Sequence, residues 1–140
     1  MKRKRRTEIL IKGNRSLANR LKEEIESRYK VTVINEPSHG LVMIKTRETA
    51  KNTLFYLGET LVTEATVYVN GSIGLGIVQG DEPELAYNLA VIDGAYKLNA
   101  KETIGWKELL LKEEKEIEEL YKIEKNKILE TKVNFETMNV

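Results

Sequence analysis

Residues 60–78 read TLVTEATVYVNGSIGLGIV, and this stretch decides the fold. From Leu61 to Val69 the odd-numbered side chains share one face and are mostly apolar, which is the pattern of a half-buried β-strand. Asn70-Gly71 is the dipeptide typical of a two-residue hairpin turn, so residues 73–78 are expected to form the returning strand. We therefore expect an antiparallel hairpin at the centre of the fold.

Further strand signals precede this hairpin. Residues 31–34 are rich in β-branched side chains and are followed by Glu36-Pro37-Ser38, which is expected to close the strand with a turn. Residues 41–47 predict a second strand, and residues 54–57 predict a return to extended structure before a bend or bulge at Gly58. Together these segments predict an antiparallel sheet of about four strands.

Helical patterns lie on both sides of the sheet-forming region. The expected helices are residues 7–12, residues 16–28, a segment from Asp81 through Tyr96, and residues 103–130. Ser16 and Asp81 are the expected N-terminal caps of the second and third helices. The fold class is therefore α+β, with the antiparallel sheet flanked by N-terminal helices and a long C-terminal helix.

Composition favours one soluble domain over residues 1–140. The chain is 41% hydrophobic and 32% charged, and it contains no cysteine, which excludes disulfides and thiolate metal sites. The apolar run after the basic start is too short for a signal peptide, and no later stretch is long enough to span a membrane. We expect a cytoplasmic location. Residues 131–140 form an apolar tail without a period, which is expected to dock either on its own domain or on another chain.

Positive charge gathers at the N-terminus, in residues 1–7. The net charge of the whole chain is only +1, yet residues 1–6 read MKRKRR. Such a run indicates either a solvated terminus or an anionic partner, and a basic nucleic-acid-binding module is the alternative function. Aromatic side chains are not interleaved with the basic ones, which disfavours specific nucleic-acid binding.

Few residues carry a recognisable chemistry. His39 is the one imidazole of the chain, and a typical zinc site needs more ligands than it can supply. The glycines of residues 71–76 lack the strand–loop–helix setting of a phosphate-binding loop and are better explained by turn geometry and close approach of strands. No nucleophile has a recognisable base, so no catalytic residue and no metal ligand is assigned, and a free-standing enzyme is disfavoured.

Two polar positions remain as candidates. The turn at Gln79-Gly80 leads into a helix start, where backbone N–H groups can meet an anion, but the acidic residues that follow favour self-capping. Asp93 lies among apolar residues of its helix, so it is either hydrogen-bonded in the core or poised for function, with the structural role preferred.

Several short segments match the pattern of a known protein family. The matching residues are Gly40, Leu41, Val42, Gly58, Thr63, Gln79, Gly80 and Asp93, with Val133, Phe135, Thr137 and Met138 near the C-terminus. On these segments the chain resembles the PhnG family over most of its length. Glu64 and Asp81-Glu82 stand where the family often has arginine, and Asn134 stands where aspartate is common.

The resemblance implies a subunit of the phosphonate carbon–phosphorus lyase system. With sister subunits, this family helps to displace adenine from ATP with an alkylphosphonate, which gives ribose 1-phosphonate 5-triphosphate. The implied partners are the other subunits of the core complex, with no membrane and no specific nucleic acid. The resemblance implies no cofactor on this subunit, whereas the complex uses ATP and a phosphonate.

Overall fold

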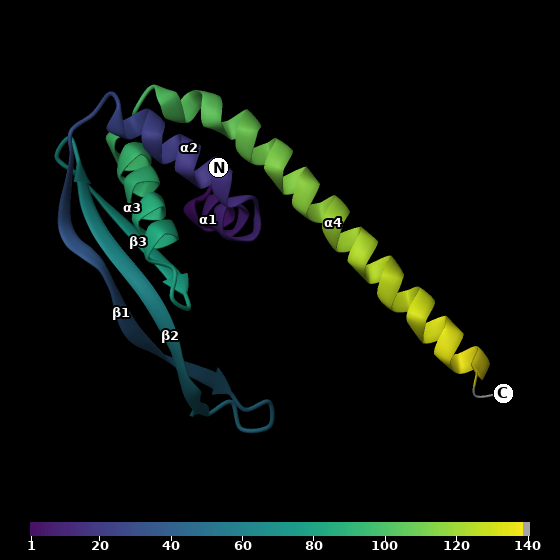
Figure 1. Ribbon diagram of the computed structural model, residues 1–140. Helices are drawn as coiled ribbons and strands as arrows, with labels where there is room; N and C mark the ends of the chain where they lie inside the picture. The colour runs from purple at the N-terminus through teal and green to yellow at the C-terminus, as the bar shows by residue number, and fades with distance from the viewer. Residues whose placement is uncertain (139–140) are drawn as a thin grey trace.

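The computed structural model describes the backbone of residues 1–138 and the side chains of residues 1–132. Its elements in chain order are α1 (Arg3–Lys12), α2 (Arg15–Glu26), β1 (Val31–Arg47), β2 (Leu54–Val69), β3 (Ser72–Gln79), α3 (Pro83–Leu98) and α4 (Glu102–Met138). The fold is α+β, as the sequence predicts, with all the helices on one side of the sheet (Figure 1).

The sheet has three antiparallel strands in the order β1-β2-β3, so the expectation of about four is wrong in number. Residues 31–34 and 41–47 belong to the single strand β1. Glu36-Pro37-Ser38 does not close a strand, because the pairing with β2 resumes after register shifts between Val33 and Ser38. An edge strand tolerates proline at such a bulge, because the N–H that proline lacks is not needed for the hydrogen bonds of a central strand.

Residues 54–57 and 60–69, which the sequence predicts as separate strand segments, likewise belong to the single strand β2. The irregularity predicted at Gly58 is confirmed, because the register shifts between Ile44, which pairs with Gly58, and Lys45, which pairs with Tyr56. The strand bends there but does not end. A bulge lets the strand continue, whereas a glycine in the sequence pattern suggests that the strand ends.

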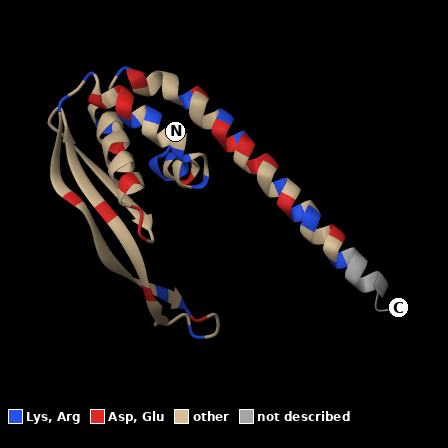
Figure 2. Cartoon of the chain, in the orientation of Figure 1, with Lys and Arg blue, Asp and Glu red and all other residues tan. Residues whose placement is uncertain are grey.

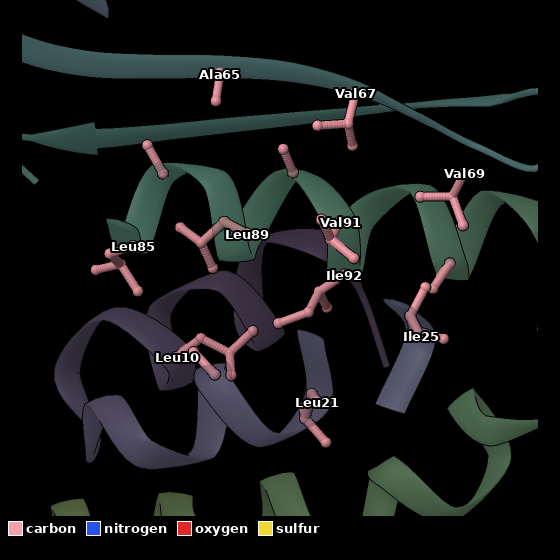
Figure 3. Packing of buried hydrophobic residues seen from close by; sticks show 14 of the residues in the cluster. Leu10, Leu21, Ile25, Ala65, Val67, Val69, Leu85, Leu89, Val91 and Ile92 are labelled. Atoms are coloured by element: carbon pink, nitrogen blue, oxygen red, sulfur yellow. The ribbon is translucent and has the colours of Figure 1, made fainter. Parts of the chain in front are cut away.

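The hairpin at Asn70-Gly71 is confirmed. Both residues have positive φ, 48° and 92°, as a type I′ turn requires, and the first pair beyond them is Val69 with Ser72. This turn fixes the register, so the side chains of Ala65, Val67 and Val69 point into the core (Figure 3).

Helix α3 is the centre of the molecule. It lies between the sheet and the pair α1–α2, and ten of its residues from Leu85 to Ala95 are buried. Leu10 of α1 and Leu21 of α2 approach it from the side away from the sheet (Figure 3). A helix that is covered on all sides must be apolar all round, so any polar residue on it needs an internal partner.

Glycines let α3 lie directly on β3. A Cβ atom at Gly74 would fall on the carbonyl oxygen of Ala90, and one at Gly76 would fall on that of Ala86. A Cβ atom at Gly94 would lie only 2.6 Å from the Val69 side chain, so α3 also packs closely on β2 at this position. The glycines of β3 therefore serve the approach of a helix, whereas the sequence reading ascribed them to turn geometry and the approach of strands.

Two elements extend past this body. The first is the β-arm, residues 40–61, which comprises the end of β1, the connection to β2 and residues 54–61 of β2, the part of β2 that does not pair with β3. The second is distal α4, residues 118–132, which follows the last core contact of that helix at Ile117. Both run beyond the body in Figure 1. Helix α4 ends at Met138 and not near residue 130, so the expected irregular tail is helical over residues 131–138.

Helix α2 is capped by Asn14 and not by Ser16. The Asn14 side chain accepts a hydrogen bond from the Ser16 N–H at 3.0 Å, and Gly13 ends α1 just before it. Within residues 1–138, no helix is both long enough and apolar enough to cross a membrane.

Candidate functional site

Asp93 on α3 is a buried carboxylate with three cationic partners. Its Oδ1 accepts a hydrogen bond from Arg6 Nη2 at 2.9 Å and forms an ion pair with Arg3 Nε at 3.0 Å. Its Oδ2 accepts a hydrogen bond from the backbone N–H of Leu75 at 3.1 Å and forms an ion pair with Lys97 Nζ at 3.1 Å. Both carboxylate oxygens are therefore occupied, and one side chain joins α1, α3 and β3.

Arg6 is the buried partner in this cluster. Its side chain is 9% exposed and its guanidinium lies 4.0 Å from the ring centroid of Tyr96, a cation–π contact. Burial lowers the pKa of Arg6, although the Asp93 carboxylate acts in the opposite direction. The cluster thus holds a strongly desolvated guanidinium in place through an ion pair and an aromatic ring.

The basic N-terminus is largely used inside the molecule. Arg3 and Arg6 bind Asp93, while Arg5 donates two hydrogen bonds, at 2.9 and 2.6 Å, to the carboxylate of Glu114 on α4. Helix α1 stands out in Figure 2 as the most basic element of the view. Because three of its arginines already have carboxylate partners, a nucleic acid would have to compete with these pairs. This counts against the nucleic-acid alternative.

Three of the family-pattern residues meet where β3 leads into α3. The Thr63 hydroxyl, which is buried, donates to the Gly80 carbonyl at 2.6 Å and accepts from the Glu82 N–H at 3.0 Å. Gly80 also donates its N–H to the Leu61 carbonyl at 2.8 Å, and the Gln79 amide donates to Thr60. The start of α3 is thus held by Thr63, and the expectation that Asp81 caps it is wrong.

Asp81 instead pairs with the one histidine. His39 Nε2 lies 2.7 Å from Asp81 Oδ1, and both side chains are largely exposed. These two residues are 42 positions apart in the sequence, so only the fold brings them together. A solvent-exposed pair of this kind links the β1 edge to the turn before α3. Within the described residues, no group of three His, Asp or Glu side chains is placed to hold a metal ion.

The remaining described family-pattern residues lie on the β-arm. Gly40, Leu41 and Val42 are in β1, with Gly58 on β2 opposite Ile44. Leu41 is 66% exposed and faces Leu61 across the ladder. Val133, Phe135, Thr137 and Met138 lie outside the residues whose side chains are described.

The exposed apolar surface of the β-arm is the feature that sequence reasoning missed. Nine of its large apolar side chains are exposed: Leu41, Val42, Met43, Ile44, Leu54, Phe55, Tyr56, Leu57 and Leu61. Side chains alternate along a strand, so Leu41 and Met43 lie on one face while Val42 and Ile44 lie on the other. In Figure 2 much of β1 and β2 is without charge. The signal in the sequence is this scarcity of charge, a pattern that buried strands share.

Distal α4 continues the same theme. Leu110, Ile117, Tyr121 and Ile128 are seven, four and seven residues apart, so they share one helix face. Leu110 is buried against the body and Ile117 partly so, whereas Tyr121 and Ile128 are exposed, at 68% and 69%. The face that attaches α4 to the body thus continues to Ile128, and no described part of the chain covers Tyr121 or Ile128.

A family model supplies the comparison with known proteins. The model described as phosphonate metabolism protein PhnG matches residues 1–139. A comparison with curated proteins gave no match.

Proposed function

The chain belongs to the PhnG family of phosphonate metabolism proteins, and on that premise we propose that it is an accessory subunit of the carbon–phosphorus lyase core complex. In this role it helps the complex to convert ATP and an alkylphosphonate into ribose 1-phosphonate 5-triphosphate and adenine, in the cytoplasm. ATP and the phosphonate are substrates of the complex, and the chain's own task is assembly.

The observation that carries the proposal is the exposed apolar surface of the β-arm. A chain that acts alone has no use for nine exposed large apolar side chains on one projecting ribbon, because such a surface promotes association. Burying one Leu or Met side chain contributes about 1.5–3 kcal/mol, so a few of them supply much of the affinity of a stable interface.

The backbone of the β-arm supports the same role. β1 is an edge strand along its whole length, and residues 54–61 of β2 have no β3 beside them. Free strand edges present rows of unpaired N–H and C=O groups, which natural proteins cover or block. A partner that adds a strand here would hydrogen-bond the free edge, and a strand or a helix packed on the arm would bury its apolar side chains.

The side chains that are present favour an accessory role over independent catalysis. The described residues offer one exposed His–Asp pair and a buried Asp93 whose two oxygens are both occupied. Neither arrangement joins a nucleophile to a base and an activating group.

Adenine release tests the proposed function directly. The pure chain is incubated with ATP and methylphosphonate, and then the same mixture is supplemented with the co-expressed sister subunits. We expect adenine only from the assembled complex, and we expect the complex to lose activity when this chain is omitted. Turnover by the chain alone would overturn the accessory role, and full activity of the complex without it would overturn the assignment to that complex.

A further inference from the structure

A pocket of about 420 Å³ lies beside Asp93. It lies where α1 crosses β3 and α3, and its apolar lining includes Leu10, Leu89 and Ile92 from the helices. Leu75 and Ile77 of β3 complete this lining. The volume falls within the range of small-molecule sites, which combine an apolar wall with a few convergent polar groups.

The polar part of the lining is dominated by positive charge. Arg3, Lys4 and Arg6 line the pocket, against two carboxylates, Glu8 and Asp93. Lys97 also binds Asp93, so three cations converge on one carboxylate whose oxygens are already shared among them. Asp93 cannot neutralise all three, and the cluster keeps a surplus of positive charge.

Hydrogen-bond donors are also in surplus. A guanidinium has five N–H donors, and the Arg6 guanidinium uses one of them on Asp93 through Nη2. Arg3 Nε forms an ion pair with Asp93 at 3.0 Å, and Arg3 Nη2 donates to the Leu75 carbonyl at 3.4 Å, a long contact. Arg6 is buried whereas Arg3 is 54% exposed, so an anion in the pocket would meet one desolvated guanidinium and one accessible from solvent, both with spare donors, beside an apolar wall that weakens the competition from water.

We propose that this pocket binds a small organic oxyanion, namely a phosphoryl, phosphonyl or carboxylate group that carries an apolar substituent. The oxyanion accepts hydrogen bonds from Arg3, Lys4 and the spare donors of Arg6, while the substituent packs on Leu75 and Ile77. The inference does not depend on the assembly role, since the pocket is built by this chain alone.

Binding is tested on the full chain with three probes of graded chemistry. Phenylphosphonate has both the oxyanion and the apolar group, benzoate exchanges the phosphonyl group for a carboxylate, and benzyl alcohol lacks the charge. Titration of a ¹⁵N-labelled sample should give saturable shifts at the Leu75 and Ile77 amides with either anion. The affinity for phenylphosphonate should fall as salt is raised, because the contact is partly electrostatic. The stronger of the two anions identifies the oxyanion class.

Matched variants locate the site. Arg3→Gln with Lys4→Gln removes two lining charges and should weaken phenylphosphonate binding about tenfold or more, since charge-assisted hydrogen bonds are lost. Lys2→Gln with Lys12→Gln removes the same charge next to and within α1, away from the lining, and should leave the affinity unchanged apart from a small salt-like effect. Arg6 is kept because it is buried.

Three results would overturn the proposal. They are an absence of saturable shifts with both anions, equal affinity of the two double variants, and binding of benzyl alcohol as tight as that of phenylphosphonate. The ¹⁵N spectrum of each variant without ligand confirms that it is folded. Failure here would leave the adenine-release experiment untouched, so the two ideas stand or fall separately.

Discussion

Asp93 shows how one residue can hold three elements together. It lies in a helix that is covered on all sides, where an unpaired charge would be strongly unfavourable. Arg6, Lys97 and the Leu75 N–H each satisfy part of the carboxylate. The cluster fastens the basic start of the chain to the centre of the fold, so the positive run is a structural element as well as a charged surface.

Asp93→Asn is expected to destabilise the isolated chain by about 3–5 kcal/mol, because it leaves the buried Arg6 guanidinium without its carboxylate. Arg3→Gln is the matched control, and it should cost less than about 1 kcal/mol because Arg3 is 54% exposed. Urea unfolding of both variants measures the difference. Equal, small losses for the two would mean that the ion pair contributes little to the fold.

Helix α4 has a first part that attaches to the body and a distal part that projects from it. Its first four turns bind the body through the buried Trp106 and Leu110, and Trp106 donates to Glu24 of α2 at 2.9 Å. Polar contacts add to this, with Glu102 accepting from Arg28 at 2.8 Å and Glu114 from Arg5. Over residues 118–132 no side chain belongs to the hydrophobic core, which leaves distal α4 available to meet another chain.

The attachment of α4 should weaken in acid. Hydrogen bonds from Arg28 and Arg5 lower the pKa of Glu102 and of Glu114 below the usual value of 4.5. A lowered folded-state pKa gives stability that is present above the unfolded pKa and is lost as the pH falls through the folded one. The difference in thermal midpoint between the wild type and Glu102→Gln with Glu114→Gln should therefore be full near pH ~6 and should shrink steadily as the pH falls below about 4.5.

Two other glutamates of the same helix provide the control. Glu108→Gln with Glu116→Gln alters exposed positions, so this double variant should follow the wild type at each pH. A gap between wild type and the Glu102/Glu114 variant that stays constant down to pH ~3 would show that the two ion pairs do not titrate as described.

At the scale of the whole molecule, local sequence signals predicted most helices and strands. They failed where the structure depends on contacts between residues that are far apart in the sequence. The Asn70-Gly71 hairpin was predictable because both residues belong to one turn with a strong conformational preference. The bulge at Pro37 was not, since only the pairing of β1 with β2 reveals that the strand continues. In the same way Arg6 and Asp93 are 87 residues apart, and nothing in the local sequence pairs them.

The site was predictable to a similar degree. Thr63, Gln79 and Gly80 were identified as family-pattern residues, but their meeting at the start of α3 depends on the β2–β3 register. The sequence predicts the strand segments of the β-arm, residues 41–47 and 54–57, but not their exposure, because exposed and buried apolar strands look alike in sequence. The exposure of its side chains and the arrangement of the helices show that no described helix covers this part of the sheet.

Capture of the chain by its sister subunits tests most directly whether the β-arm is an assembly surface. Leu41→Gln with Met43→Gln removes two exposed side chains from one face of the arm, and Ile104→Gln removes an 80% exposed one from the start of α4. All three positions are exposed, so each variant should keep the thermal midpoint of the isolated chain within a few degrees. We expect the arm variant to lose about tenfold or more in affinity in a quantitative pull-down with co-expressed subunits, while Ile104→Gln binds as the wild type does. Undiminished capture of the folded arm variant would contradict the account.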